Sequence, residues 1–159
     1  MPSKPFRHSA GFGKRIEYYI IGLLLKEGID VFLPMIDDDA IDAVIKKPDG
    51  KYVEIQIKAR SKDIKFGDAG LFAAIEHEYR DNYWFIFYVE RIDTILIMSS
   101  KEFIKEADQN KNGKNIGKRT IWFNGKSTKE NREYIKPRFE KYIVNNFSRL
   151  LDEDPNKTE

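Results

Sequence analysis

Cysteine is absent from the 159-residue chain, and histidine occurs only as His8 and His77. Without thiols the chain forms neither a disulfide nor a thiolate metal site, and two histidines argue against a histidine-rich zinc site. No apolar run approaches the roughly 20 residues that span a bilayer. The N-terminal sequence also lacks the apolar centre of a signal peptide. We therefore expect a cytoplasmic protein with no membrane segment.

The composition is that of a folded protein. Hydrophobic residues make up 41% of the chain and charged residues 34%, which favours a soluble globular domain over disorder. The length is sufficient for one domain with a proper core. We expect a single domain over residues 1–159, with a core at about 11–100, a basic helical part at 101–150 and a frayed tail at 151–159.

The net charge of +2 conceals an uneven distribution of charge along the chain. Residues 101–149 contain 13 Lys or Arg against 6 Asp or Glu. Residues 111–119, KNGKNIGKR, hold four bases and no acid: Lys111, Lys114, Lys118 and Arg119. A basic segment beside an acidic pocket suits a polyanion together with a cation. The alternative is a solvated loop and helix face.

Hydrophobic periodicity predicts an α/β fold. Residues 12–28 carry apolar side chains at helical spacing and end at Gly28, a typical helix stop. The turn at 48–50 joins two segments that predict a β-hairpin, and two unbroken apolar segments predict strands covered on both faces. The expected strands are 29–34, 40–47, 51–60, 83–90, 94–99 and an edge strand at 119–123. The expected helices are 12–28, 67–80, 100–108 (capped by Ser99 or Ser100) and 128–151 (kinked or divided at Pro137). This order predicts a mixed central sheet flanked by helices.

Polar residues interrupt the apolar pattern of the hairpin. In residues 51–60, Val53, Ile55 and Ile57 share one face of the strand, whereas Glu54, Gln56 and Lys58 share the other. The neighbouring strand places Asp42 among apolar residues, in the sequence AIDAVI. A buried carboxylate needs a partner or a metal ion. Mg²⁺ fits this set because it takes hard oxygen ligands and keeps several waters, and a nearby lysine can stabilise charge on a phosphate.

These residues resemble the PD-(D/E)XK nuclease superfamily. The similarity runs from Gly11 to Glu90: a helix, a hairpin with an aspartate followed by an acid-x-Lys motif, a second helix and a further strand. Asp42 matches the first acidic position, while Gln56 and Lys58 match the second motif as IQIK. Glu17 matches a helix glutamate that contacts metal in relatives. The resemblance implies that Asp42, Gln56 and Glu17 bind metal and that Lys58 is catalytic.

One position departs from the superfamily pattern, because Gln56 stands where an acid is usual. Its amide oxygen can coordinate a metal but brings no charge, so metal affinity should fall. Some members of the superfamily have Gln-x-Lys, and they resemble homing endonucleases and junction or repair nucleases. Glu54 could supply the missing carboxylate, and the acidic run Asp37 to Asp39 could also contribute.

Each candidate residue has a structural alternative. Asp42 could cap the hairpin, Lys58 could be a solvated strand lysine, and Glu17 could favour its helix electrostatically. Lys14 and Arg15 could contact phosphate or be ordinary surface charges. Separately, His77 is expected to be a surface or packing histidine on the 67–80 helix. Three aromatic residues are expected in the core, namely Trp84, Trp122 and Tyr134, and the alternative for the last two is stacking on bases.

The sequence thus favours a Mg²⁺-dependent endonuclease, with Mn²⁺ as a possible substitute, that hydrolyses DNA phosphodiester bonds. RNA is not excluded as a substrate, and a homodimer is possible. The alternative is a nuclease-fold module that has lost hydrolysis and serves to bind nucleic acid or a protein.

Overall fold

A computed structural model describes residues 9–152 of the chain. His8 and most of the predicted tail, residues 153–159, lie outside the described range. Within residues 9–152, none of the helices has the length and apolar character that a bilayer crossing demands.

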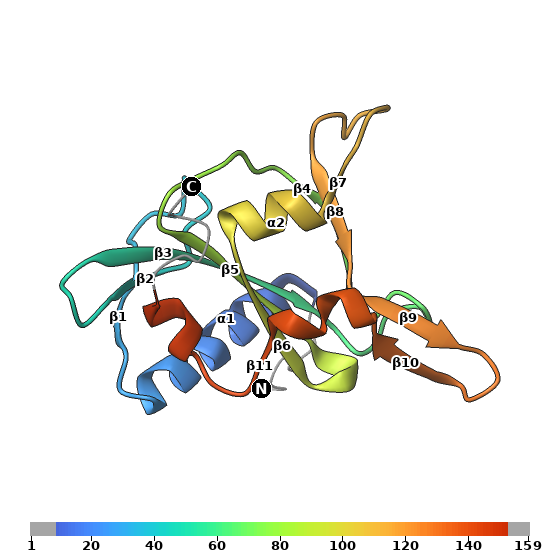
Figure 1. Ribbon diagram of the computed structural model, residues 1–159, viewed down its shortest axis with the longest axis horizontal. Helices are drawn as coiled ribbons and strands as arrows, with labels where there is room; N and C mark the ends of the chain where they lie inside the picture. Colours follow the sequence, from blue (N-terminus) through green and yellow to red (C-terminus); the bar gives the residue numbers. More distant parts are fainter. Residues whose placement is uncertain (1–8, 153–159) are drawn as a thin grey trace, which may run out of the picture.

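A mixed six-stranded sheet forms the centre of the molecule, as predicted (Figure 1). β3 and β5 pair in parallel, and the remaining neighbours pair antiparallel. All seven residues of β5 are buried, which agrees with the unbroken apolar sequence of this strand. The spatial order is β1 (Asp30–Phe32), β2 (Ala43–Lys46), β3 (Tyr52–Arg60), β5 (Tyr83–Val89), β6 (Thr94–Ser99) and β11 (Ile143–Val144).

One face of this sheet packs on the helix α1 (Ser9–Lys26), which lies below the sheet in Figure 1. Ile16, Ile20 and Leu24 of α1 meet Ile55 and Trp84 of the sheet in a continuous apolar core. The helix ends as expected at Gly28, whose φ of 79° is a conformation that glycine adopts without strain.

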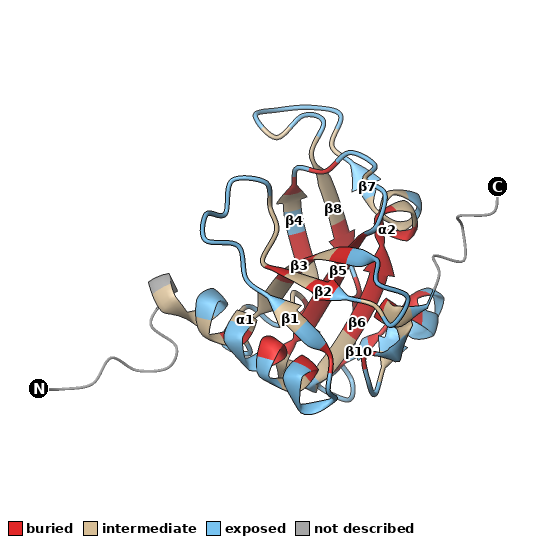
Figure 2. Ribbon diagram, turned by 90° about the vertical axis from the view of Figure 1, so that its left-hand side faces the viewer, coloured by how far each residue is buried: buried red, intermediate tan, exposed pale blue. Residues whose placement is uncertain are grey.

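The other face carries a second, aromatic core, in which Phe85, Phe87, Phe103 and Phe123 are fully buried. It is covered by α2 (Ser100–Glu106), which begins with the predicted Ser99 cap in a reciprocal capping box with Glu102. A three-stranded sheet of order β4 (Leu71–Ile75), β8 (Arg119–Trp122), β7 (Asp108–Gln109) lies on this side, beside the hairpin of β9 (Asn124–Ser127) and β10 (Arg132–Ile135). The 3-10 turns are η1 (Glu90–Ile92), η2 (Pro137–Tyr142) and η3 (Ser148–Leu151). Burial is concentrated between these layers (Figure 2).

Residues 67–80 were expected to form a helix, and this prediction is wrong: the segment contains strand β4. Its alanines favour a helix, but Phe72 and Ile75 are buried against β8, where pairing and packing outweigh intrinsic propensity. A register shift between these two residues, with Ala74 at a φ of 56°, hides the strand alternation in the sequence.

The helix expected at 128–151 is also wrong. Most of residues 124–144 form β9, β10, η2 and β11, and residues 148–151 form η3. In β10, Glu133 and Ile135 are buried whereas Arg132 and Tyr134 are exposed, which is the alternation of a strand. Pro137 begins the η2 turn, because its ring fixes φ and removes an N–H group. The basic part of the chain is therefore largely strands and turns.

Three further predictions for this part of the chain need correction. The strand at 119–123 is not an edge strand, since β8 lies between β4 and β7. Trp122 and Tyr134 are 44% and 38% exposed, so neither is a core residue, whereas Trp84 is buried as expected. His77 is buried but lies outside any helix, on the segment after β4.

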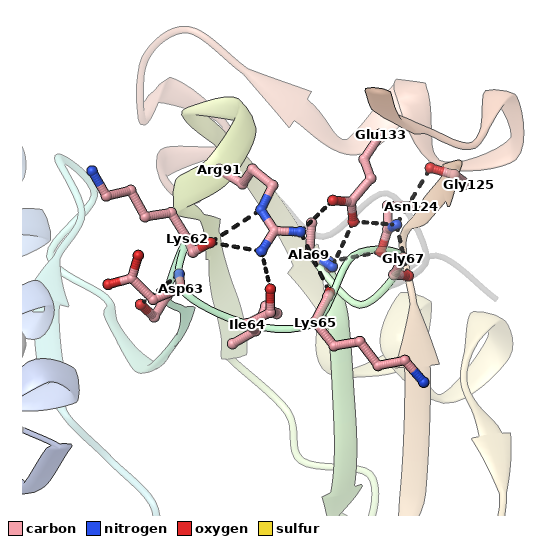
Figure 3. Close-up of polar contacts among 12 residues, drawn as sticks. Lys62, Asp63, Ile64, Lys65, Gly67, Ala69, Arg91, Asn124, Gly125 and Glu133 are labelled. Atoms are coloured by element: carbon pink, nitrogen blue, oxygen red, sulfur yellow. Dashed lines mark hydrogen bonds and ion pairs between the residues drawn. The ribbon is translucent and has the colours of Figure 1, made fainter. Parts of the chain in front are cut away.

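A buried polar network holds the loop that follows β3 (Figure 3). The Arg91 guanidinium donates to the backbone carbonyls of Lys62 and Ile64 and pairs with Glu133. Glu133 Oε2 also accepts from the Ala69 backbone N–H at 2.9 Å and from Asn124 Nδ2 at 3.1 Å. Because these bonds join the loop to η1, β9 and β10, they fix the segment that begins where β3 ends.

Candidate active site

Asp42 lies at the fork where β2 separates from β3. The strand pairing ends at Ala43 and Ile55, and β3 continues alone on this side. The Asp42 backbone N–H donates to the Ile55 carbonyl at 2.8 Å, and its carboxylate Oδ2 accepts from the Ile57 N–H at 2.7 Å. The side chain thus replaces the missing strand partner. Since Ile57 separates Gln56 from Lys58, the carboxylate lies against the backbone of the Gln-x-Lys segment.

The same carboxylate lines a small pocket of about 60 Å³, roughly the volume of two water molecules. The pocket brings together Asp42, Glu17 and Lys14, with Asp37 from the acidic loop. Lys14 Nζ pairs with Glu17 Oε2 at 2.8 Å, and this bond raises the pKa of the lysine. The apolar walls are Tyr18, Ile21, Leu33, Pro34 and Ile41.

The electrostatics of the pocket disfavour a bare carboxylate. Burial raises the pKa of Asp42 to about 6, and the negative charges of Glu17 and Asp37 act in the same direction. The bond from the Ile57 N–H and the charge of Lys14 oppose this shift. Three acids thus face one lysine, and a divalent cation would relieve the excess negative charge.

Gln56 and Lys58 lie on the opposite side of β3 from its buried residues, as the alternation predicted. The Gln56 Oε1 atom is 3.0 Å from the Tyr83 hydroxyl, which also lies 2.5 Å from the Ala40 carbonyl oxygen. On the same face Glu54 pairs with Arg80, so it is committed to an ion pair. Lys58 is half-buried on β3, opposite Phe87 of β5.

The structure places Glu17 with Asp42 in one pocket. Lys58 and Gln56 do not line this pocket, and both lie on the face of β3 that points away from α1. Of the three predicted ligands, Asp42 and Glu17 therefore share the pocket, and Gln56 lies next to the fork. Their oxygens, two carboxylates and one amide, are the hard ligands that Mg²⁺ takes, so the donor chemistry of these residues fits that ion. Among the described residues there is no group of three or more His, Cys, Asp or Glu placed to hold a metal. Asp42, Glu17 and Asp37 line one pocket but do not form such a group.

The predicted phosphate contacts occupy two different regions. On α1, Lys14 is exposed but engaged by Glu17, while Arg15 is half-buried. Of the other four cations, three belong to the β7–β8 connection, which projects from the body at the top of Figure 1, and Arg119 is the first residue of β8. Lys111 and Lys114 are exposed there, Lys118 is half-buried, and Arg119 Nε donates to the His77 carbonyl at 3.2 Å.

A larger hollow of about 520 Å³ lies near α2, lined by Lys101, Glu102, Ile104, Lys105, Lys141, Tyr142 and Arg149. Its carboxylate, Glu102, pairs with Arg149 and caps α2 through the Ser99 N–H, so this acid serves the fold. The pocket at the β2–β3 fork is therefore the better candidate despite its smaller volume.

Sequence reasoning missed the residues that surround the Tyr83 hydroxyl, close to the fork. Tyr83 is buried, its ring stacks on His77 at 5.1 Å, and the Arg80 guanidinium lies 4.4 Å from the ring centroid. His77 contacts Ser100 Oγ at 2.7 Å, and burial lowers its pKa to about 4, which keeps it neutral. The available signal was a tyrosine hydroxyl within an apolar strand, since a buried hydroxyl requires a partner.

No family model and no curated protein matches this sequence. A solved structure does: that of a bacterial homing endonuclease, I-Ssp6803I, with a TM-score of 0.54 and 21% identity. The alignment covers 86% of this chain and 88% of the other. The two chains share a fold. At this identity the similarity is one of architecture, so the chemistry has to be argued from the residues of the fork.

Proposed function

We propose that the chain is a metal-dependent endonuclease that hydrolyses DNA phosphodiester bonds, of the PD-(D/E)XK type. The observation that carries the proposal is the position of the Asp42 carboxylate. It accepts a hydrogen bond from the N–H of Ile57, the residue between Gln56 and Lys58 in the sequence, and it lines a pocket that also contains Glu17. The fold shared with a homing endonuclease supports the same reading. A homodimer, with one such pocket for each strand of a duplex, belongs to this proposal.

In this proposal Asp42, Glu17 and Gln56 hold a Mg²⁺ ion. When bound, the ion lowers the pKa of a coordinated water and polarises the phosphate. The pocket orients the Asp42 carboxylate through the Ile57 N–H, so the ligand is fixed before an ion arrives. Lys58 follows Gln56 on the same face of β3 and stabilises negative charge that develops on the phosphate.

One feature favours a second candidate function, a nuclease-fold module that binds nucleic acid without cleaving it. Gln56 contributes no charge at a position where the superfamily has an acid, and a ligand set with one charge fewer binds Mg²⁺ less tightly. The basic β7–β8 connection would serve either function. Cleavage itself separates the two candidates.

Purified protein is expected to cleave plasmid and oligonucleotide DNA in Mg²⁺ or Mn²⁺ and to stop when EDTA is added. Lys58→Ala should lower the cleavage rate by about 100-fold, because it removes a charge aimed at the transition state. Lys46→Ala is the matched control: Lys46 is an exposed lysine on the neighbouring strand β2 and should leave the rate unchanged. DNA binding with no cleavage in either metal would support the binding module instead.

Single alanine substitutions of Lys111 and Lys114 are expected to weaken DNA binding most at low salt. If each lysine contacts one phosphate, each substitution reduces the slope of log K against log salt by about 0.9. Fluorescence anisotropy with a labelled duplex, and with an RNA duplex for comparison, measures this slope. Lys26→Ala, an exposed lysine at the end of α1, is the control. Unchanged slopes in both loop variants would remove the β7–β8 connection from the interface.

A further inference from the structure

The structure assigns to Tyr83 a positioning role: its hydroxyl turns the Gln56 amide so that the amide oxygen is free for a cation, and this requires glutamine at position 56. Tyr83 touches neither the ion nor the substrate and acts only through Gln56 and Ala40. The inference rests on the proposed function in one respect, that the freed oxygen serves a metal ion.

The Tyr83 hydroxyl has one hydrogen and two oxygen neighbours. The Tyr83 oxygen lies 2.5 Å from the Ala40 carbonyl oxygen and 3.0 Å from the Gln56 Oε1 position. A hydroxyl has one hydrogen, and a carbonyl can only accept. The shorter contact takes the hydrogen, so Tyr83 donates to Ala40. Gln56 then satisfies the Tyr83 oxygen best with its NH₂ group, after a half turn of the amide, which directs the amide oxygen away from the tyrosine.

The tyrosine cannot relax away from this arrangement. The residue is 2% exposed, and its ring contacts both the His77 ring and the Arg80 guanidinium. Arg80 also donates to the Asp39 carbonyl at 2.6 Å. Tyr83 and Arg80 together hold the backbone of residues 39 and 40, three and two residues before Asp42, near β3.

This geometry explains why glutamine replaces the usual acid. A carboxylate at position 56 would have only acceptor oxygens. It would compete with the Ala40 carbonyl for the one Tyr83 hydrogen. The oxygen that lost this competition would have no donor and would face the lone pairs of the Tyr83 oxygen. An amide avoids the conflict because it can donate to the tyrosine with one end and offer its oxygen with the other.

Mn²⁺ binding, measured by calorimetry without DNA, tests the inference. Tyr83→Phe keeps the ring contacts and is expected to weaken Mn²⁺ binding about 10-fold. Gln56→Glu adds a charge yet should bring no gain in affinity. In the Tyr83→Phe background the same Gln56→Glu change should raise affinity about 10-fold, because the competing hydroxyl is gone. Tyr88→Phe is the matched control, a buried tyrosine on the same strand whose hydroxyl bonds Asp93 at 2.8 Å.

A metal-free measurement keeps this inference separate from the proposed function. In EDTA at constant pH, Gln56→Glu should lower the melting temperature clearly in the presence of Tyr83 and much less in Tyr83→Phe. If wild-type protein binds no Mn²⁺ but this coupling is present, the metal proposal fails and the Tyr83–Gln56 pairing stands. The inference is overturned if Gln56→Glu changes Mn²⁺ affinity and melting temperature equally with and without the Tyr83 hydroxyl.

Discussion

Asp42→Asn is expected to abolish DNA cleavage and, in the absence of metal, to stabilise the fold. The amide can still accept the Ile57 N–H bond through its oxygen, so the β2–β3 fork should remain formed. It cannot replace the carboxylate charge, and loss of a direct ligand should lower the rate by at least about 100-fold. Plasmid cleavage at saturating Mg²⁺ measures this loss. A variant with near wild-type cleavage would remove Asp42 from the site.

The stability gain follows from the raised pKa of Asp42. Its folded-state value of about 6 lies above the ordinary 3.8, so between these values the folded state holds more protons than the unfolded state. Stability therefore falls as pH rises through this window, and the asparagine variant escapes the loss. After discounting for partial exposure, the gain above pH 6 is about 1 to 2 kcal/mol.

Thermal melts in EDTA from pH 4 to 8 measure this difference. The melting temperature of Asp42→Asn should exceed that of wild type by more at pH 7 than at pH 4. Mg²⁺ should reduce this difference in melting temperature, because it stabilises the wild-type protein, which binds the ion, and not the variant. Asp30→Asn, at an exposed position on β1, should show no such trend. An asparagine variant that is less stable than wild type at pH 8 in EDTA would contradict the electrostatic account.

Glu133→Ala is expected to destabilise the protein by about 3 to 5 kcal/mol, the usual cost of removing one partner from a buried ion pair. The Glu133 side chain is 1% exposed and accepts from Arg91, the Ala69 N–H and Asn124, so the substitution removes one buried acceptor that three donors share. For a domain of this size the melting temperature should fall by about 10 °C or more. Calorimetry or chemical denaturation measures the change.

The same hairpin provides a matched control. Glu130 also pairs with an arginine, Arg132, but their side chains are 55% and 58% exposed. Exposed ion pairs contribute little to the free energy of unfolding, so Glu130→Ala should change it by less than about 1 kcal/mol. Equal losses for the two variants would mean that the network around Arg91 is not what holds the loop after β3.

The β2–β3 hairpin shows how much the sequence could predict. The turn at 48–50 and the alternation of Val53, Ile55 and Ile57 predicted both strands and their faces. The first strand is shorter than the predicted 40–47, because β2 covers only Ala43–Lys46 and Asp42 precedes it. These features are local: a turn residue with φ of 85° at Gly50 and a period of two are written in adjacent positions. Asp42 was identifiable for the same reason, as an acid among apolar neighbours.

Tertiary contacts decided the elements that local propensity misjudged. Phe72 becomes a strand residue because β8, some fifty residues later, pairs with it, and no pattern within residues 67–80 encodes that partner. Glu133 is buried because Arg91 and Asn124 meet it, so a hairpin of charged residues forms where a helix was expected.

The sequence by itself determined the hairpin, the buried strands and the positions of the acids and the lysine, because side-chain alternation and turn geometry depend on neighbouring residues. Only the tertiary structure decided that Glu17 shares a pocket with Asp42 and that Tyr83 reaches both Ala40 and Gln56. Those contacts join side chains of α1, β3 and β5 to residues 40 and 42 just before β2, and their distances depend on how the helix and the strands pack together.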